Sequence, residues 1–443
     1  MDDTAGLTPK IKNNKIFFGW WTVLGTGIIC GLVQGFYVYG ISVIFKPLSA
    51  ELGFNRAVTS VGAGIGKLEG GITGPLTGWL VDKFGPKWVI FYSVLFIGVG
   101  LVLVNYIQSL WAYYVVWGVI ISSGVNMGLT LPVDKTLTDW FVRKRGLAVG
   151  IKFAFISIGG VVVVPIITWL TRDYGWRLAC VIWGLVTFAT LLLVIFFVRQ
   201  KRPEYYGLLP DGARAEADIA GADLVTRGIQ YASEVQETEF TLRQALKTPT
   251  YWILMVAGIG YLATHNAIVV HAIPFLTDMG IDPTLAGFMM SLMIFFTIPS
   301  RFFSGVIIDW VKKGHLKFVL AASFLLEAAG IAAFLLKPGV PSVYIFFILF
   351  GFGAGAPTTL VVLMRGRYFG RKAYGSIAGF SSMVSSPAAL VAPVFAGWVY
   401  DTTGNYTSAF ILLGALAAFC AVLMMFIKAP AAPSQVTSTS KFM

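Results

Sequence analysis

The sequence predicts an all-α membrane protein in which twelve transmembrane helices form two pseudo-symmetric bundles of six. Three observations support this fold class: the composition, the recurrence of apolar windows, and a repeat between the two halves. Of the 443 residues, 57% are hydrophobic and only 12% are charged, whereas soluble domains carry about 25% charged residues. Windows of roughly twenty apolar residues, long enough to cross a bilayer, recur twelve times along the chain.

The expected spans fall into two groups of six, separated by one long polar stretch. They cover residues 18–45, 57–80, 87–108, 111–134, 146–170, 176–198, 250–275, 284–308, 317–336, 341–364, 374–399 and 407–427. The polar stretch, 199–249, is rich in Glu, Asp, Ala and Gly, and we expect a linker with one short amphipathic helix there. The domains are therefore an N-terminal segment (1–17), a first bundle (18–198), the linker, a second bundle (250–428) and a tail (429–443).

Lys and Arg residues concentrate on one side of the expected membrane. The N-terminus, the loops leading from even to odd spans, the linker and the C-terminus together carry 24 of the 33, and the opposite loops carry five. Because cytoplasmic segments carry the excess of positive charge, both termini and the linker are expected in the cytoplasm. The net charge of +12 therefore reflects membrane topology rather than nucleic-acid binding. We expect a monomeric, multi-pass protein of the plasma membrane, in contact with the lipid bilayer.

Sequence signals recur between the two halves at almost one offset. Gly78 and Asp82 recur as Gly305 and Asp309, 227 residues later. Three further pairs share offsets of 228 or 229: Trp140-Phe141 with Tyr368-Phe369, Gly146 and Gly150 with Gly375 and Gly379, and Pro165 with Pro393. Parallel repeats of this kind pack about an axis along the membrane normal, with the substrate site between them.

Several classes of protein are disfavoured by what the sequence lacks. The three cysteines lie in separate apolar runs without disulfide or metal spacing. We find no metal-spaced His/Asp/Glu cluster, nucleophile constellation or phosphate-binding glycine loop, so an enzyme, a cofactor or a metal site is not expected. A membrane sensor without transport remains the alternative from another class, although no soluble output domain accompanies the spans.

The most informative single residue is Arg301, which lies within the eighth expected span. A charge at membrane depth costs from about 2.5 to above 10 kcal/mol, so it persists where function or pairing compensates it. Thr297 shares its helix face at i−4 spacing. A guanidinium binds a carboxylate through two parallel hydrogen bonds and stays charged, which favours an anion site. The alternative is a structural ion pair with Glu69 or Glu327.

Two stretches carry a family resemblance. GWLVDKFGPK (78–87) resembles the signature of the major facilitator superfamily, and WFVRKRGLAVGIKFA (140–154) is similar to the fifth-span motif of monocarboxylate transporters and their oxalate/formate-exchanger relatives. The resemblance implies the major facilitator fold and places Arg301 at the substrate-binding arginine of that family. This sequence departs from that family at two positions. Thr297 stands where proton-coupled members carry an aspartate, and Tyr39 stands near the place where they carry a lysine in the first span. Carboxylate binding is therefore implied, while proton symport, exchange and uniport remain open.

Other charged and polar residues within the spans are candidates for the same site. Lys152 is expected either to contribute to the anion site or to reach the membrane interface, and Asn126 to hydrogen-bond in the cavity. Glu69 is a candidate proton-coupling carboxylate or the partner of a cation from another span. His265 titrates near neutrality and is a second proton-coupling candidate, with a structural histidine as the alternative. Tyr39 is expected to line the pocket.

A conformational latch is expected near the cytoplasmic ends of the second and eighth spans. Its members are Asp82, Lys83 and Asp309. Taken together, the sequence predicts a secondary transporter of small organic anions such as lactate, pyruvate or formate, working by alternating access and coupled to protons. The alternative within the class is an oxalate/formate-type anion exchanger that uses Arg301 and Lys152 together, with a counter-anion in place of the proton.

Overall fold

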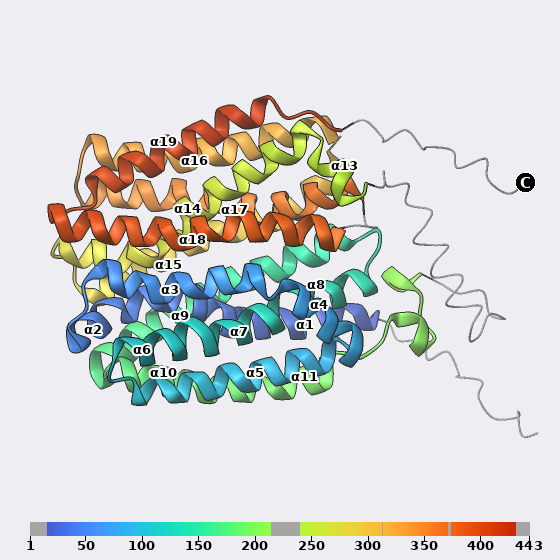
Figure 1. Ribbon diagram of the computed structural model, residues 1–443, viewed down its shortest axis with the longest axis horizontal. Helices are drawn as coiled ribbons and strands as arrows, with labels where there is room; N and C mark the ends of the chain where they lie inside the picture. The colour runs from blue at the N-terminus through green and yellow to red at the C-terminus, as the bar shows by residue number, and fades with distance from the viewer. Residues whose placement is uncertain (1–15, 214–239, 312, 371–373, 431–443) are drawn as a thin grey trace, which may run out of the picture.

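The computed structural model describes residues 16–213, 240–311, 313–370 and 374–430, and all regular structure within these ranges is helical. The helices lie side by side in two groups along one long axis (Figure 1). We call the end where the described termini and the linker lie the linker end, and the opposite end the far end. The predicted all-α membrane fold is confirmed.

The first half contains six helical passes, several of them divided. Their helices are α1 (Phe18–Ile29), α2 (Ile41–Leu52), α3 (Arg56–Ile72), α4 (Gly74–Phe84), α5 (Pro86–Leu103), α6 (Leu110–Tyr113), α7 (Ser122–Gly124), α8 (Leu131–Trp140), α9 (Arg145–Tyr174), α10 (Trp176–Ala189) and α11 (Leu191–Phe197). Two of these passes contain π-helical turns, at Cys30–Gln34 and Phe36–Gly40 in the first pass and at Tyr114–Ile121 and Val125–Thr130 in the fourth. Such turns occur mostly at functional sites.

The second half follows the same plan with less interrupted helices. After the short α13 (Leu242–Leu246), its helices are α14 (Pro249–Asp278), α15 (Pro283–Trp310), α16 (Leu316–Leu336), α17 (Val340–Phe369), α18 (Tyr374–Thr403) and α19 (Thr407–Met425). Across the described chain, eleven helical stretches are long and apolar enough to cross a membrane. The remaining expected span, 57–80, is divided at Thr73 into α3 and α4, of 17 and 11 residues, and neither helix alone is long enough to be counted among them.

The two halves meet along two helix pairs, α9 with α15 and α3 with α18, which the sequence repeat relates to each other. Close approach depends on glycine. A Cβ placed on Gly305 of α15 would lie 2.7 Å from the Gly146 carbonyl oxygen and 3.0 Å from the Gly150 Cα on α9. On the other pair, a Cβ at Gly71 of α3 would lie 2.4 Å from the Ser386 hydroxyl oxygen on α18.

The linker begins by packing against the first half. The Asp211 carboxylate accepts hydrogen bonds from the backbone N–H groups of Val142, Arg143 and Lys144, at 3.1, 2.8 and 3.0 Å. This contact holds the start of the linker against the turn between α8 and α9. At its other end the Phe240 N–H donates to the Phe369 carbonyl at 3.0 Å.

Candidate functional site

Arg301 lies on α15 where that helix packs against the first half, and only 3% of the residue is exposed. Its guanidinium donates to the Ser157 hydroxyl at 2.8 Å, to the Phe153 carbonyl at 3.3 Å and to the Tyr39 hydroxyl at 3.3 Å. All three partners are neutral and belong to the first half. The Nε–H is buried and has no partner among the described residues. The positive charge of Arg301 is therefore held in place without being neutralised.

The alternative considered for Arg301, an ion pair with Glu69 or Glu327, is absent from the described residues, because both carboxylates bond elsewhere. Glu69 accepts from the Asn126 amide at 2.8 Å, and Glu327 accepts from the Thr264 hydroxyl at 3.2 Å. Each of these carboxylates keeps one oxygen buried without a partner.

Tyr39 and Thr297, two of the predicted substrate-binding residues, both lie near Arg301, and their role in binding stays a prediction. Tyr39 comes from the π-helical turn Phe36–Gly40 and lies against Gly160 of α9, where a Cβ would come within 2.4 Å of its ring. Thr297 lies one turn before Arg301 and its hydroxyl is 2.5 Å from that of Ser157. Ser157 thus contacts both residues; sequence reasoning missed it, because a serine in a long apolar helix is ordinary.

His265 lies near the same place on α14. Its ring stacks on Tyr261 with centroids 5.1 Å apart, and Tyr261 in turn bonds Thr358 of α17 at 2.5 Å. The Nδ1 atom of His265 is buried and has no partner among the described residues. The next residue on the helix, Asn266, lines a cavity together with Lys67.

Glu69 and Asn126 form a second polar group in the first half. The Asn126 amide donates to the Gly66 carbonyl at 2.7 Å as well as to Glu69. Asn126 lies in the π-helical turn Val125–Thr130 of the fourth pass. The two residues are half-buried, and the described structure brings them together with each other rather than with Arg301.

Lys152 has a partner that the sequence analysis did not foresee. Its ammonium forms an ion pair with the Asp134 carboxylate at 2.8 Å, and its side chain is 1% exposed. Both residues belong to the first half, on α9 and α8. The arrangement differs both from a free cation at the anion site and from a lysine that reaches the membrane interface.

Lys67 is the cation that sequence reasoning left without a role. Its ammonium lies 5.0 Å from the centroid of the Tyr37 ring, and no carboxylate within the described residues pairs with it. Lys67 lines a cavity of about 20 Å³, enough for about one water, between the first, second and fourth passes and helices α14 and α18. A signal was present in the sequence: Lys67 and Glu69 are two residues apart and so point to different helix faces.

The expected latch can be described only in part. The side chains of Asp82 and Asp309 lie outside the described residues. Lys83 is exposed and its ammonium is 4.8 Å from the centroid of the Trp79 ring. The latch therefore stays a prediction.

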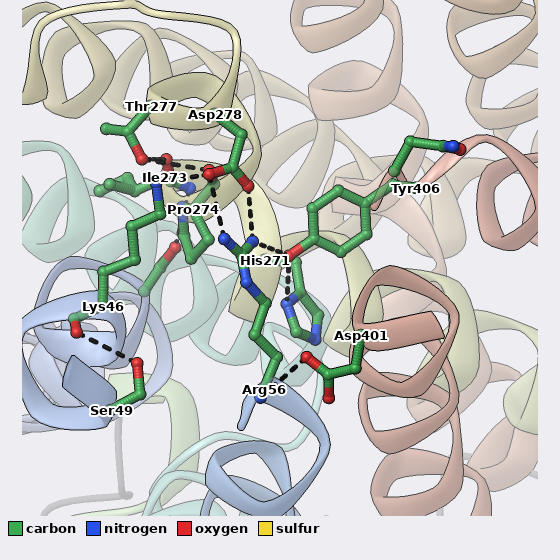
Figure 2. A network of polar contacts seen from close by, with 12 residues as sticks. Lys46, Ser49, Arg56, His271, Ile273, Pro274, Thr277, Asp278, Asp401 and Tyr406 are labelled. Carbon is green, nitrogen blue, oxygen red and sulfur yellow. Dashed lines mark hydrogen bonds and ion pairs between the residues drawn. The ribbon is translucent and has the colours of Figure 1, made fainter. Parts of the chain in front are cut away.

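The far end is closed by a polar network between the halves that sequence reasoning missed (Figure 2). The Arg56 guanidinium contacts the Asp278 carboxylate and the Tyr406 hydroxyl, each at 2.6 Å. Lys46 pairs with the same carboxylate at 2.6 Å. The Asp401 carboxylate accepts from the Arg56 backbone N–H at 3.2 Å. Lys46 and Arg56 belong to the first half and the other three to the second, so this network joins the halves.

His271 completes the far-end network. Its Nε2 lies 2.9 Å from the Pro393 carbonyl, which can only accept, so Nε2 carries a proton. Its Nδ1 is 3.0 Å from the Tyr406 hydroxyl. Burial raises the pKa of Tyr406 above its ordinary value despite the opposing charge of Arg56, so the phenol stays protonated. Within the described residues no group of three or more His, Cys, Asp or Glu side chains has the spacing of a metal site.

Comparisons with known proteins agree with this architecture. The family model of the Major Facilitator Superfamily matches residues 27–319 and 310–442. Monocarboxylate transporter 13 of Bos taurus is 25% identical over 405 residues, covering 90% of this chain and 86% of the relative. Monocarboxylate transporter 4 of Rattus norvegicus is 26% identical over 404 residues, covering 90% and 80%. The probable sulfoacetate transporter SauU of Cupriavidus necator is 24% identical over 365 residues, covering 80% of each chain.

Proposed function

Because the chain belongs to the Major Facilitator Superfamily, we propose that this membrane transport protein carries small organic anions, monocarboxylates first, by alternating access of its two halves. The observation that supports the substrate class is Arg301: a buried guanidinium without an acidic partner among the described residues, bonded only to neutral groups. The relatives named as monocarboxylate transporters support the same class.

A carboxylate is the natural ligand of this guanidinium. Arginine has five N–H donors in a planar fork, cannot be neutralised by deprotonation, and binds a carboxylate through two parallel bonds. Tyr39 and Ser157 hold the fork in place, while the Nε–H has no partner among the described residues. An incoming carboxylate would therefore replace bonds from a charged donor to neutral acceptors with bonds between opposite charges in a bidentate geometry.

The direction of access follows from the closed far end. The distribution of Lys and Arg assigns the linker end to the cytoplasm, so the far-end network would seal the outer side. We therefore interpret the structure as a state closed to the outside, in a monomer of the plasma membrane. Binding of an anion by groups from both halves changes the relative stability of the two facing states, which is what alternating access requires.

For coupling, we propose proton symport through Glu69. One of its oxygens bonds the neutral Asn126 amide and the other has no partner among the described residues. A carboxylate in that position can be protonated without breaking an ion pair. His265 is the second candidate, since its Nδ1 has no described partner and it lies near Arg301.

Anion exchange is the second candidate function. The similarity to a probable sulfoacetate transporter favours it, because sulfoacetate carries two anionic groups and a carrier of such anions can balance charge by returning another anion.

The test is uptake of labelled lactate, pyruvate and formate into proteoliposomes, with and without an inward proton gradient. Arg301→Ala should reduce uptake at least about tenfold, as expected for the loss of charge-assisted hydrogen bonds. Arg177→Ala is the matched control, because Arg177 is a far-end arginine whose partners, Glu51 and the carbonyls of Val104 and Asn105, all belong to the first half. Equal uptake by wild type and Arg301→Ala, with equal melting temperatures, would contradict the proposed site.

A further inference from the structure

We propose that Lys67 forms a second anion subsite, so that the chamber between the halves accepts a short organic dianion, one group on Arg301 and the other on Lys67. This inference rests on the proposed function and deepens it by naming the substrate's second group. The anionic groups are identified by chemistry alone: a carboxylate with a second carboxylate, or a carboxylate with a sulfonate.

The first argument is that Lys67 lacks a counter-charge. Its ammonium lies over the Tyr37 ring, and no described carboxylate pairs with it. Glu69, two residues along the same helix, is bonded to Asn126 instead. Lysine within a membrane span is rare and normally paired or functional, and a contact with an aromatic face leaves its full charge in place.

The second argument is the contrast with Lys152, the buried lysine that the sequence analysis put forward for the anion site. Lys152 is neutralised by Asp134 at 2.8 Å. If two cations bind one substrate, the structure favours Lys67 over Lys152 as the companion of Arg301, since only the former has no acid beside it. The sequence predicted Lys152 of α9 as the second cation, and the structure favours Lys67 of α3 in its place.

The third argument is position. Lys67 lies on α3 in the first half and Arg301 on α15 in the second. Both contact the π-helical turn Phe36–Gly40: the Lys67 ammonium lies over the Tyr37 ring, and the Arg301 guanidinium bonds the Tyr39 hydroxyl. Lys67 also borders the cavity at the interface with Asn266 of α14, whose amide can hydrogen-bond an oxyanion. Arg301 and Lys67 thus offer two charged donors, one on each half, neither of which pairs with a described carboxylate. A monoanion can engage only one of them with a charged group, whereas a dianion can engage both.

This arrangement would make the substrate a bridge between the halves. A ligand with one group on Arg301 and the other on Lys67 would link α15 to α3, and its binding would change the relative stability of the states that the two halves adopt. The 20 Å³ cavity is too small for any such ligand in the state described here, so the dianion would bind in a state where the halves stand further apart.

The experiment compares ligands that differ by one charge. The purified wild-type protein is titrated with two pairs of ligands: malonate with its monomethyl ester, and sulfoacetate with acetate. Binding is measured as the rise in the melting temperature of the protein. We expect malonate and sulfoacetate to bind at least about tenfold more tightly than their singly charged counterparts, the gain typical of one further charge-assisted bond. Preference for malonate alone would identify a dicarboxylate, and preference for sulfoacetate alone a sulfonate; both support the dianion.

Variants then assign the preference to Lys67. Lys67→Gln should abolish it while changing acetate binding less than about threefold, and Lys67→Arg should retain it. Lys337→Gln, at an exposed lysine outside the bundle interior, is the control. Equal affinity of wild type for dianions and monoanions, or a preference that survives Lys67→Gln, would overturn the inference.

The outcome separates this inference from the proposed function. Monoanion transport that depends on Arg301 but shows no dianion preference would refute only the Lys67 subsite. Failure of every anion to bind or move, with a folded protein, would refute the proposed function itself. If Lys67→Gln does not fold, the wild-type ligand pairs and Lys67→Arg still decide the question.

Discussion

Adding one methyl group at Gly305 is expected to destabilise the protein, while the same change at Gly78 is not. The two glycines are related by the sequence repeat. At Gly305 a Cβ would lie 2.7 Å from a backbone oxygen and 3.0 Å from a backbone carbon of α9, and backbone atoms cannot swing aside. At Gly78 no described atom lies within 4 Å of the added Cβ.

The expected magnitude follows from two opposing terms. Glycine to alanine within a helix gains about 1 kcal/mol of helix propensity, and this gain applies to both positions. Overpacking costs about 1–3 kcal/mol, and it applies only at Gly305. The propensity term cancels when the variants are compared, so Gly305→Ala should be less stable than Gly78→Ala by about 1–3 kcal/mol, or about 2–6 °C in melting temperature.

The assay is thermal unfolding of both purified variants in one detergent, followed by tryptophan fluorescence at one scan rate. Transport should follow the same order, because Gly305 lies one helical turn after Arg301 and its displacement would move the guanidinium away from Ser157 and Tyr39. Equal melting temperatures for the two variants would show that α9 and α15 do not approach as closely as the structure has them.

Three further predictions concern the charged groups. Asp278→Asn should open the far end, because it weakens the contacts of Asp278 with Arg56 and Lys46. A cysteine placed at Ser60 should then react faster with maleimide. Unchanged labelling would argue against a gate. Lys152→Met should cost on the order of 2 kcal/mol by leaving Asp134 unpaired, and a double variant that also carries Asp134→Leu should recover most of it in thermal unfolding. Glu69→Gln should remove stimulation by the proton gradient while leaving exchange intact, and persistent stimulation would exclude this carboxylate.

The fold was predictable because hydropathy and charge act over whole segments. Twenty apolar residues specify a membrane helix whatever their order, and each expected span has a helical counterpart in the structure. The division of the second span at Thr73 was harder to predict, although the glycine and proline beside it are usual causes of a helix break.

A site residue could be predicted where its own residue type is unusual for its position. A contact between two helices could not, because it depends on how the helices are rotated against each other. Arg301 stands out because charge is rare at membrane depth, and the structure places it beside Tyr39 and near Thr297. The pairing of Lys152 with Asp134 depends on the rotation of α8 against α9, which a single sequence does not specify. Arg56 and Asp278 lie 222 residues apart and look like ordinary loop charges.

The sequence repeat pairs each glycine at the interface with a counterpart in the other half, so a comparison of their contacts indicates which conformational state the structure is in. Gly305 touches α9 at the linker end, but its counterpart Gly78 has open space, and so does Gly379, the counterpart of Gly150. One of two equivalent contacts is therefore made and the other is open at the linker end, while the far end is held by Arg56 and Asp278.

If the halves rock, the opposite state should bring Gly78 and Gly379 together and break the Arg56 contact. Arg301 lies between these two regions and contacts the first half directly. An anion that displaces those contacts would loosen one of the ties at the centre of the interface. This gives a physical reason why an empty site would favour the state seen here, and why substrate would make it easier to leave.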